Sequence, residues 1–199
     1  MSTLTKLGPM DHGRPYSLEE FEEADYEGGF KYELIDGRLF VSPMPDLPEN
    51  SLEEWLGLKL RFYSHKYPTR INYVSGKGRV FISGRRHTTC PEPDLSAYRD
   101  FPLDVPIRLR RWQDLRPILV VEIMTGDAWK DLGRNVELYL QVPSIREYWV
   151  LDGRENPDEP ALIQHRRHGK RWVVRTYPYG STFTTRLLPG FRLVIDPRQ

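Results

Sequence analysis

The sequence has little cysteine, no long apolar run and almost no net charge. A single cysteine among 199 residues, Cys90, excludes an internal disulfide framework and a cysteine-based zinc cluster, and it predicts a reducing, cytoplasmic compartment. No run of about 18 apolar residues occurs and Met1 to Met10 has no apolar core, so neither a membrane span nor a signal peptide is predicted. The 29 basic and 28 acidic residues leave a net charge of +1, so no global basic field indicates nucleic acid.

The histidines also lack the spacing that metal sites use. No two of them form a His-x-x-x-His pair, and the nearest two, His165 and His168, fall in a basic segment that indicates a turn. No Cys-His constellation accompanies Cys90 that would activate its thiol. Histidine-bound metal and a cysteine nucleophile are therefore both disfavoured.

What the sequence does contain predicts one folded domain built from many short elements. Apolar residues make up 39% of the chain and aromatic residues 12%, which is enough for a substantial core. Seventeen prolines and fifteen glycines predict frequent turns. Residues 1–16 are polar and punctuated by Pro and Gly, so we expect a flexible N-terminal arm followed by a domain over residues 17–199.

Local patterns predict the first elements. The capping box Ser17-Leu18-Glu19-Glu20 predicts a short helix to about Asp25. Asp36-Gly37, between two alternating runs within residues 31–41, predicts a hairpin. An amphipathic helix is expected over residues 49–66, with apolar positions at Leu52, Trp55, Leu56, Leu58, Leu60, Phe62 and Tyr63.

The second half predicts a mixed sheet. Strands are expected at 71–75, 79–83, around Asp94, at 118–124 and at 146–152, and a charged loop at 99–115. A helix over 127–141, with Trp129, Leu132, Val136 and Leu140 on or near one face, would make a parallel crossover between the last two strands. Segments 161–166, 171–177 and 191–195 predict a closing antiparallel set. The expected fold class is α/β, with an α+β mixed sheet, flanking helices and extra hairpins.

Two lone acids carry the strongest functional signal. Asp94 and Glu122 each lie in a short apolar segment that is typical of a buried strand. Burying an uncompensated polar group costs roughly 2 to 7 kcal/mol, so each carboxylate needs a partner. A shared cation such as Mg²⁺ would serve both, because it prefers hard oxygen ligands and supports phosphodiester chemistry. Separate ion pairs with arginines would serve equally well, and the two segments alone leave both interpretations open.

The order of four blocks resembles the Uma-type restriction-endonuclease-like family, a group of predicted nucleases in the PD-(D/E)XK superfamily. The blocks are Tyr32-Glu33-Leu34-Ile35-Asp36-Gly37, Pro93-Asp94, Val120-Val121-Glu122-Ile123 and Glu147-Tyr148-Trp149-Val150-Leu151-Asp152. The similarity runs from about Tyr16 to Ile195 and includes Leu188-Pro189-Gly190-Phe191. It implies a restriction-endonuclease-like core, dependence on Mg²⁺ (with Mn²⁺ able to substitute) and cleavage of DNA. Many nucleases of this superfamily dimerise to cut both strands, so a homodimer is a further expectation.

The resemblance also implies roles for individual residues. Asp94 matches the Asp of the Pro-Asp motif and Glu122 the second metal ligand, and the backbone carbonyl of Ile123 would be a further ligand. Glu33 matches a characteristic acid of the family hairpin. It would either bind metal through a water or pair with an arginine.

The chain departs from the family at the catalytic lysine. The usual position, two residues after the Glu, is Met124, and the alternative position in the following helix, four residues before Tyr139, is Asn135. Lys130 and Arg134 lie on the same expected helix, and Lys130 is the candidate for a migrated lysine. Without such a residue the site would bind metal and turn over slowly or not at all.

Three functions remain open on the sequence. The first is a Mg²⁺-dependent DNA endonuclease, and the second is a degenerate relative that binds nucleic acid or a protein partner without cutting. The third is a metal-dependent hydrolase of another phosphoester. A basic group from Lys130 or Arg134 that reaches Asp94 and Glu122 would favour the first.

Overall fold

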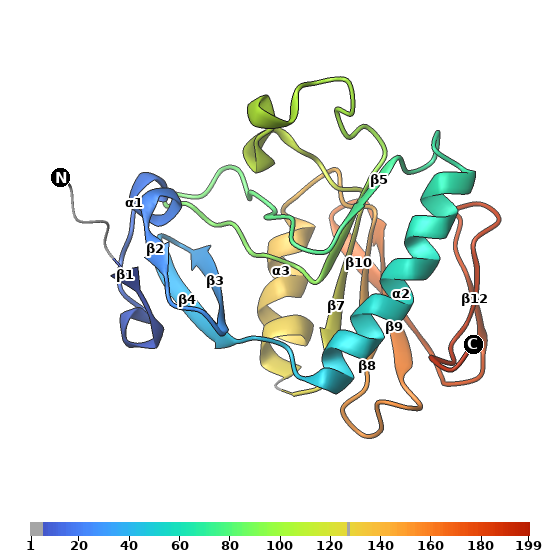
Figure 1. Cartoon of the computed structure of the whole chain (residues 1–199). Coiled ribbons are helices and arrows are strands. Elements are labelled where there is room, and N and C mark those ends of the chain that lie inside the picture. Colours follow the sequence, from blue (N-terminus) through green and yellow to red (C-terminus); the bar gives the residue numbers. More distant parts are fainter. Residues whose placement is uncertain (1–5, 127) are drawn as a thin grey trace.

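A six-stranded mixed sheet forms the centre of the protein, seen here in a computed structural model that describes residues 6–126 and 128–199 (Figure 1). The strand order is β10-β9-β8-β7-β6-β5. Only β7 and β8 run parallel, and the other neighbours are antiparallel. The strands are β5 (Tyr73–Ser75), β6 (Leu95–Tyr98), β7 (Leu119–Met124), β8 (Glu147–Asp152), β9 (Ala161–His168) and β10 (Arg171–Tyr177). The parallel pair confirms the predicted crossover and the α/β mixed-sheet fold class.

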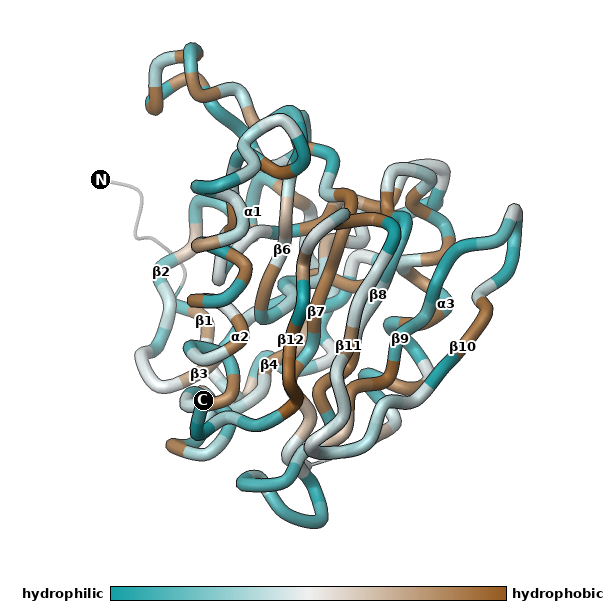
Figure 2. Tube along the Cα trace, turned by 90° about the vertical axis from the view of Figure 1, so that its right-hand side faces the viewer, coloured by the Kyte–Doolittle hydropathy of each residue, from teal (hydrophilic) through white to brown (hydrophobic). Residues whose placement is uncertain are grey.

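One helix layer covers each face of this sheet. Helix α2 (Leu47–Lys66) packs its buried residues, among them Leu56 and Leu60, against Val121 and Trp149. On the other face α3 (Asn135–Leu140) packs Leu138 and Tyr139 against Val120 and Tyr148. Figure 2 shows β7 as a mostly hydrophobic trace between the two layers. Because successive residues of a strand point to opposite faces, the even-numbered positions of β7 face α3.

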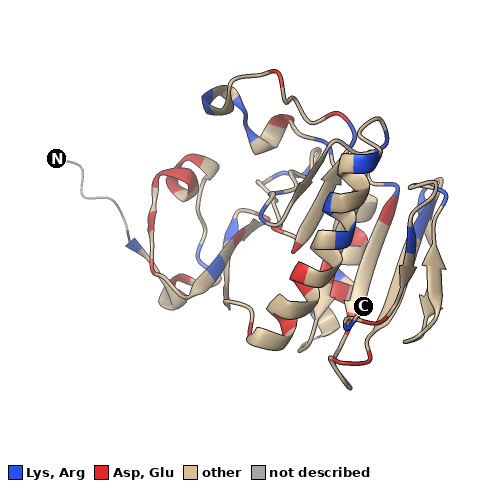
Figure 3. Cartoon of the chain, turned by 45° about the vertical axis from the view of Figure 1, so that its right-hand side comes forward, with Lys and Arg blue, Asp and Glu red and all other residues tan. Residues whose placement is uncertain are grey.

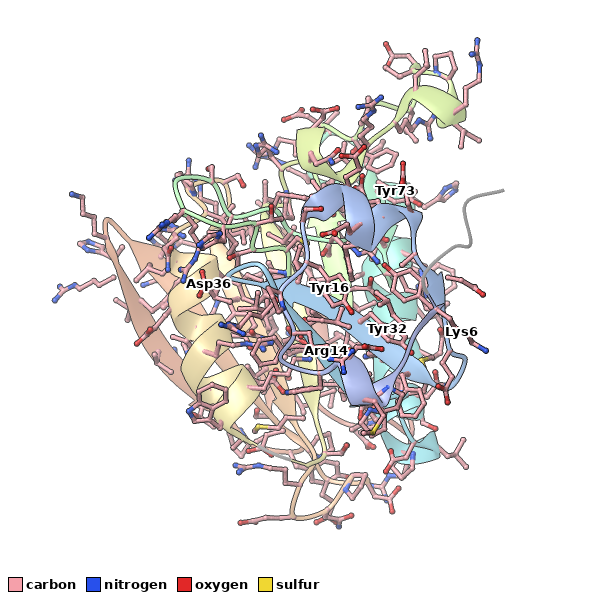
Figure 4. The ribbon with its side chains drawn as sticks, turned by 90° about the vertical axis from the view of Figure 1, so that its left-hand side faces the viewer. Lys6, Arg14, Tyr16, Tyr32, Asp36 and Tyr73 are labelled. Carbon is pink, nitrogen blue, oxygen red and sulfur yellow. The ribbon has the colours of Figure 1, made fainter. Side chains whose placement is uncertain are left out.

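A smaller module precedes this core and packs beside it. Strands β3 (Phe30–Ile35) and β4 (Arg38–Pro43) form the predicted hairpin, and Asp36 and Gly37 at its turn have φ angles of 50° and 69° (Figure 4). Two positive φ angles are what a two-residue hairpin turn requires. Helix α1 (Leu18–Glu23) begins with the predicted capping box, in which the Ser17 Oγ accepts from the Glu20 amide at 3.1 Å.

Residues 6–16, placed by the sequence in an arm, make specific contacts with this module. Strand β1 (Lys6–Leu7) pairs in parallel with β2 (Asp25–Tyr26), and a 3₁₀ turn follows at Pro9–Asp11. Leu7 is fully buried in a small core that also contains Phe21 and Leu34. Residues 1–5 lie outside the described residues, and the domain boundary at residue 17 stays a prediction.

Several local expectations need correction. Residues 79–83 are not a strand: they end in a turn at Ser83, and only Val80 and Ile82 donate backbone hydrogen bonds, to the carbonyls of Pro91 and Thr89. The C-terminal strand β12 (Arg192–Val194) pairs with β11 (Thr182–Thr184) in a separate sheet and does not close the central one. Leu58 and Phe62 of α2 are exposed, because the helix packs on the sheet through a narrower face. Short 3₁₀ turns, Ile107–Leu109 and Trp112–Asp114, interrupt the predicted 99–115 loop.

No helix in the part of the chain that the structure describes has the length and apolar character needed to cross a membrane.

The packing of α2 predicts a contrast between two leucines of one helix. Leu56 is fully buried, so Leu56→Ala should lower the free energy of unfolding by about 2 to 5 kcal/mol. Leu58 is 50% exposed, and Leu58→Ala should change it by only about 0.5 kcal/mol. Urea unfolding followed by circular dichroism measures both, and equal losses would show that the helix face is wrongly assigned.

Candidate functional site

Asp94, directly before β6, and Glu122, within β7, lie close together on two neighbouring strands. Leu95 of β6 pairs with Val121 of β7, so the register brings the preceding residue Asp94 to the level of Glu122. Both side chains are almost completely buried, at 3% and 1% exposure. Two carboxylates so placed repel each other, and each needs its own compensation.

Both carboxylate oxygens of Asp94 accept a hydrogen bond. Its Oδ2 accepts a hydrogen bond from the Ile123 amide at 2.7 Å, and its Oδ1 lies 2.6 Å from the Nζ of Lys31 on β3. The same Nζ lies 3.8 Å from Glu49 at the start of α2. Burial alone would lower the pKa of Lys31, but the negative charge of Asp94 raises it above its usual value, so the lysine stays charged. Asp94 is thus held by a lysine, which the sequence did not indicate.

Only one of the two carboxylate oxygens of Glu122 accepts hydrogen bonds from described residues. Its Oε1 accepts hydrogen bonds from Asn135 Nδ2 and from the Tyr139 hydroxyl, each at 2.8 Å. Its Oε2 is buried and has no hydrogen-bond partner among the described residues. Among the described residues, the cation nearest to this oxygen is Lys130 Nζ, at 4.0 Å. Burial raises the pKa of Glu122 well above its usual value, and the nearby carboxylates of Asp131 and Asp94 raise it further.

Glu33 forms the third acidic position of the cluster. One of its oxygens accepts from the Glu92 amide and the other from Arg134, both at 2.9 Å. Burial alone would raise the pKa of Glu33, but the positive charges of Lys130 and Arg134 lower it below the usual value. Of the two roles that the resemblance left open for Glu33, the arginine pair is present in the structure, and the metal role stays a prediction. Through the Glu92 amide this acid also fixes the chain just before Pro93-Asp94.

The helix after β7 turns a polar face toward Glu122. Asp131, Asn135 and Tyr139 are buried at spacings of four, whereas Trp129 and Leu132, expected near the apolar face, are exposed. A π-helical turn over Lys130–Arg134 precedes α3 and changes which side chains face the sheet. Asp127, the expected first residue of this helix, lies outside the described residues. The Asn-x-x-x-Tyr spacing was the signal in the sequence for these two hydrogen-bond donors to Glu122, since residues four apart share a helix face.

The donor set suits a hard divalent cation. Asp94, the free Oε2 of Glu122 and a backbone carbonyl are oxygen ligands of the kind that Mg²⁺ prefers. The Met124 carbonyl accepts from the Gly153 amide on the β8 side, so the Ile123 carbonyl, one residue earlier, points toward β6 and Asp94. Among the described residues, no three Asp, Glu, His or Cys side chains converge into a ready-made metal cage. Two carboxylates and a carbonyl are therefore the set that this site offers.

A cavity of about 560 Å³ lies beside Lys31 and Pro93. Its wall includes basic residues, Lys77 and Arg79, and the acid Glu53 of α2. Burial and the charge of Asp94 raise the pKa of Glu53 to about 7. Figure 3 shows acidic residues on the first turns of α2 and basic residues on its last turns. The acidic end of the helix thus lies toward the site.

The raised pKa of Asp131 predicts how stability depends on pH. Burial raises this pKa from 3.8 to about 7, so the folded protein holds a proton that the unfolded chain releases. The resulting stabilisation is complete below about pH 4 and is lost as the pH rises through about 7. Asp131→Asn keeps an Oδ1 acceptor for Asn135 and should flatten this part of the profile in thermal melts between pH 4 and pH 8. Asp158→Asn, at an exposed aspartate, should leave the profile unchanged, and a parallel shift in both variants would contradict the assignment.

Comparison with known proteins identifies a family and a fold. The model of the Uma2 family, described as "Putative restriction endonuclease", matches residues 18–196. The fold is similar to a crystal structure titled as "a putative nuclease belonging to DUF820" from Anabaena variabilis ATCC 29413. The TM-score is 0.64 at 16% identity over 91% of this chain and 96% of that one. Among curated proteins, none matches the sequence.

Proposed function

The chain belongs to the Uma2 family of restriction-endonuclease-like proteins, and from this premise we propose that it is a Mg²⁺-dependent DNA endonuclease that hydrolyses phosphodiester bonds. The observation that carries the proposal is the Oε2 of Glu122, which is buried and has no hydrogen-bond partner among the described residues. An unsatisfied buried carboxylate oxygen costs on the order of 1 to 3 kcal/mol or more. A cation bound there would remove this cost, and folded proteins rarely keep such an atom without a use for it.

Asp94, Glu122 and the carbonyl of Ile123 would hold the ion, and Mn²⁺ would substitute for Mg²⁺. When bound, such an ion activates water and neutralises charge on a phosphoryl oxygen. Asn135 and Tyr139 hold Glu122 through Oε1, which leaves Oε2 turned toward the site. Glu33 acts as a positioning residue, because its bond to the Glu92 amide fixes the segment that carries Asp94.

Lys130 takes the role of the family lysine in this proposal. Met124 cannot stabilise negative charge, and Asn135 is already bound to Glu122. Lys130 comes from the π-helical turn, and its Nζ lies 4.0 Å from Glu122. Burial alone would lower the pKa of Lys130, but the charges of Glu122 and Glu33 raise it. The ammonium therefore stays protonated and can stabilise charge that develops on a phosphate.

A second candidate is a relative that binds nucleic acid or a protein partner without cutting. The observation in its favour is that both oxygens of Asp94 are already satisfied, by Lys31 and by the Ile123 amide. In that case the ion pair would be the permanent compensation for Asp94. DNA as a substrate that is cleaved and a homodimer as the assembly belong to the first candidate.

Calorimetric titration with Mn²⁺ and a plasmid-nicking assay together separate the two candidates. The wild type should bind the ion, and Asp94→Ala and Glu122→Ala should each abolish the heat signal, because each removes a ligand. In parallel, supercoiled plasmid should be nicked by the wild type with Mg²⁺ and not by Asp94→Ala. Glu23→Ala, an exposed acid of α1, is the matched control for both assays. Binding that survives in folded Asp94→Ala and Glu122→Ala would refute the site.

If Lys130 stabilises charge on the phosphate, its removal should slow cleavage without weakening the binding of the metal ion. Lys130→Met should slow cleavage by about a hundredfold, the usual effect of removing one charge-stabilising donor, and should not weaken Mn²⁺ binding. Lys170→Met, on the exposed turn between β9 and β10, should cleave normally. If Lys130→Met cleaves as fast as the wild type, a different cation stabilises the phosphate.

A further inference from the structure

Lys31 stands at the position that a cation bound to Asp94 would need. Its Nζ lies 2.6 Å from Asp94 Oδ1, while Asp94 Oδ2 is held by the Ile123 amide within the sheet. Because the backbone amide holds Oδ2, Oδ1 is the oxygen of Asp94 that a cation would bind. The lysine and a divalent cation would compete for this one oxygen.

Lys31 and Lys130 differ in this respect. Lys130 Nζ is 4.0 Å from Glu122 Oε2, which lies beyond hydrogen-bond range and leaves that oxygen open. Lys31 makes the short, charge-assisted contact, and because like charges repel, a divalent cation at Oδ1 would displace its ammonium. The chain offers it two alternative environments. Glu49 lies 3.8 Å from the same Nζ, and the cavity of about 560 Å³ is lined by Lys31 itself.

We infer that Lys31 is a movable charge that neutralises Asp94 in the cation-free protein and contacts the substrate phosphate once a divalent cation has taken Asp94 Oδ1. The inference rests on the proposed function, because it needs an ion at Asp94 and a phosphodiester substrate. A lysine suits this role, since its ammonium sits on a flexible four-carbon stem and accepts many geometries. Lys31 would then be a second phosphate-contacting lysine, from the N-terminal hairpin and not from the helix after β7.

The test compares Lys31→Met with Lys77→Met. Both remove one positive charge from the wall of the same cavity, but Lys77 is exposed and forms no ion pair among the described residues. Mn²⁺ titration, melting without metal and plasmid cleavage at saturating Mn²⁺ are measured for each.

Lys31→Met removes a unit charge in contact with Asp94 and should therefore lower the Mn²⁺ dissociation constant about tenfold or more. The melting temperature without metal should fall, because Asp94 loses its partner, and cleavage should slow at least tenfold despite the tighter ion. Lys77→Met should change each quantity by no more than about twofold.

Each result bears on the inference separately from the proposed function. If the wild type binds Mn²⁺ and cleaves but Lys31→Met binds the ion no more tightly, Lys31 is a structural partner and this inference alone fails. Tighter binding with undiminished cleavage would overturn the transfer to phosphate. If neither the wild type nor Lys31→Met binds Mn²⁺, the proposed ion site fails and this inference with it.

A second measurement covers the case in which Lys31→Met does not fold. In the wild type, the nitrogen-15 signal of the Lys31 ammonium is followed by NMR while Mg²⁺ is added. The signal should shift at the concentrations that saturate the ion site, while the Lys77 signal stays in place. A Lys31 signal that does not move on saturation would overturn the inference.

Discussion

The burial of two adjacent carboxylates, Asp94 and Glu122, is the constraint on which the rest of this structure depends. Neither can leave the sheet, because each continues a strand whose other residues build the core. Moving an uncompensated charge into a protein interior costs several kcal/mol, which is a large share of the stability of a domain. The surrounding elements are consequently arranged so that each acid meets donors or a cation.

This requirement explains how the N-terminal module meets the central sheet. The hairpin contributes Lys31 to Asp94 and Glu33 to Arg134, so its contact with the core is ionic as well as apolar. The helix after β7 contributes the opposite set, with Asn135 and Tyr139 on Glu122 and Lys130 nearby. Charges from three separate elements thus meet at one place. Buried charges add little to the stability of a fold, even when they are paired. Their concentration at one place therefore supports a role in binding or chemistry.

The sequence predicted the parts of this arrangement that depend on local pattern. The capping box, the Asp36-Gly37 turn and the crossover follow from neighbouring residues, and so does the placement of Asp94 and Glu122 in buried segments. Lys31 could not be predicted, because its contact spans 63 positions and only the docking of the hairpin creates it. The helix face was predicted wrongly at Trp129 and Leu132, since a regular period assumes no π-helical turn, whereas Val136 packs against the core as expected. In the sequence, Asn135 stood out only because it occupies a position where the family has a lysine. In the fold its side-chain amide donates a hydrogen bond to Glu122.

The most direct measurement of the central claim is a crystal structure of the protein soaked with Mn²⁺, with the ion located by its anomalous scattering. The account predicts a single strong peak within coordination distance of Asp94 Oδ1, Glu122 Oε2 and the Ile123 carbonyl, with the Lys31 ammonium withdrawn from Asp94. A fully soaked crystal with no peak at this place, and with Lys31 still bound to Asp94, would contradict it.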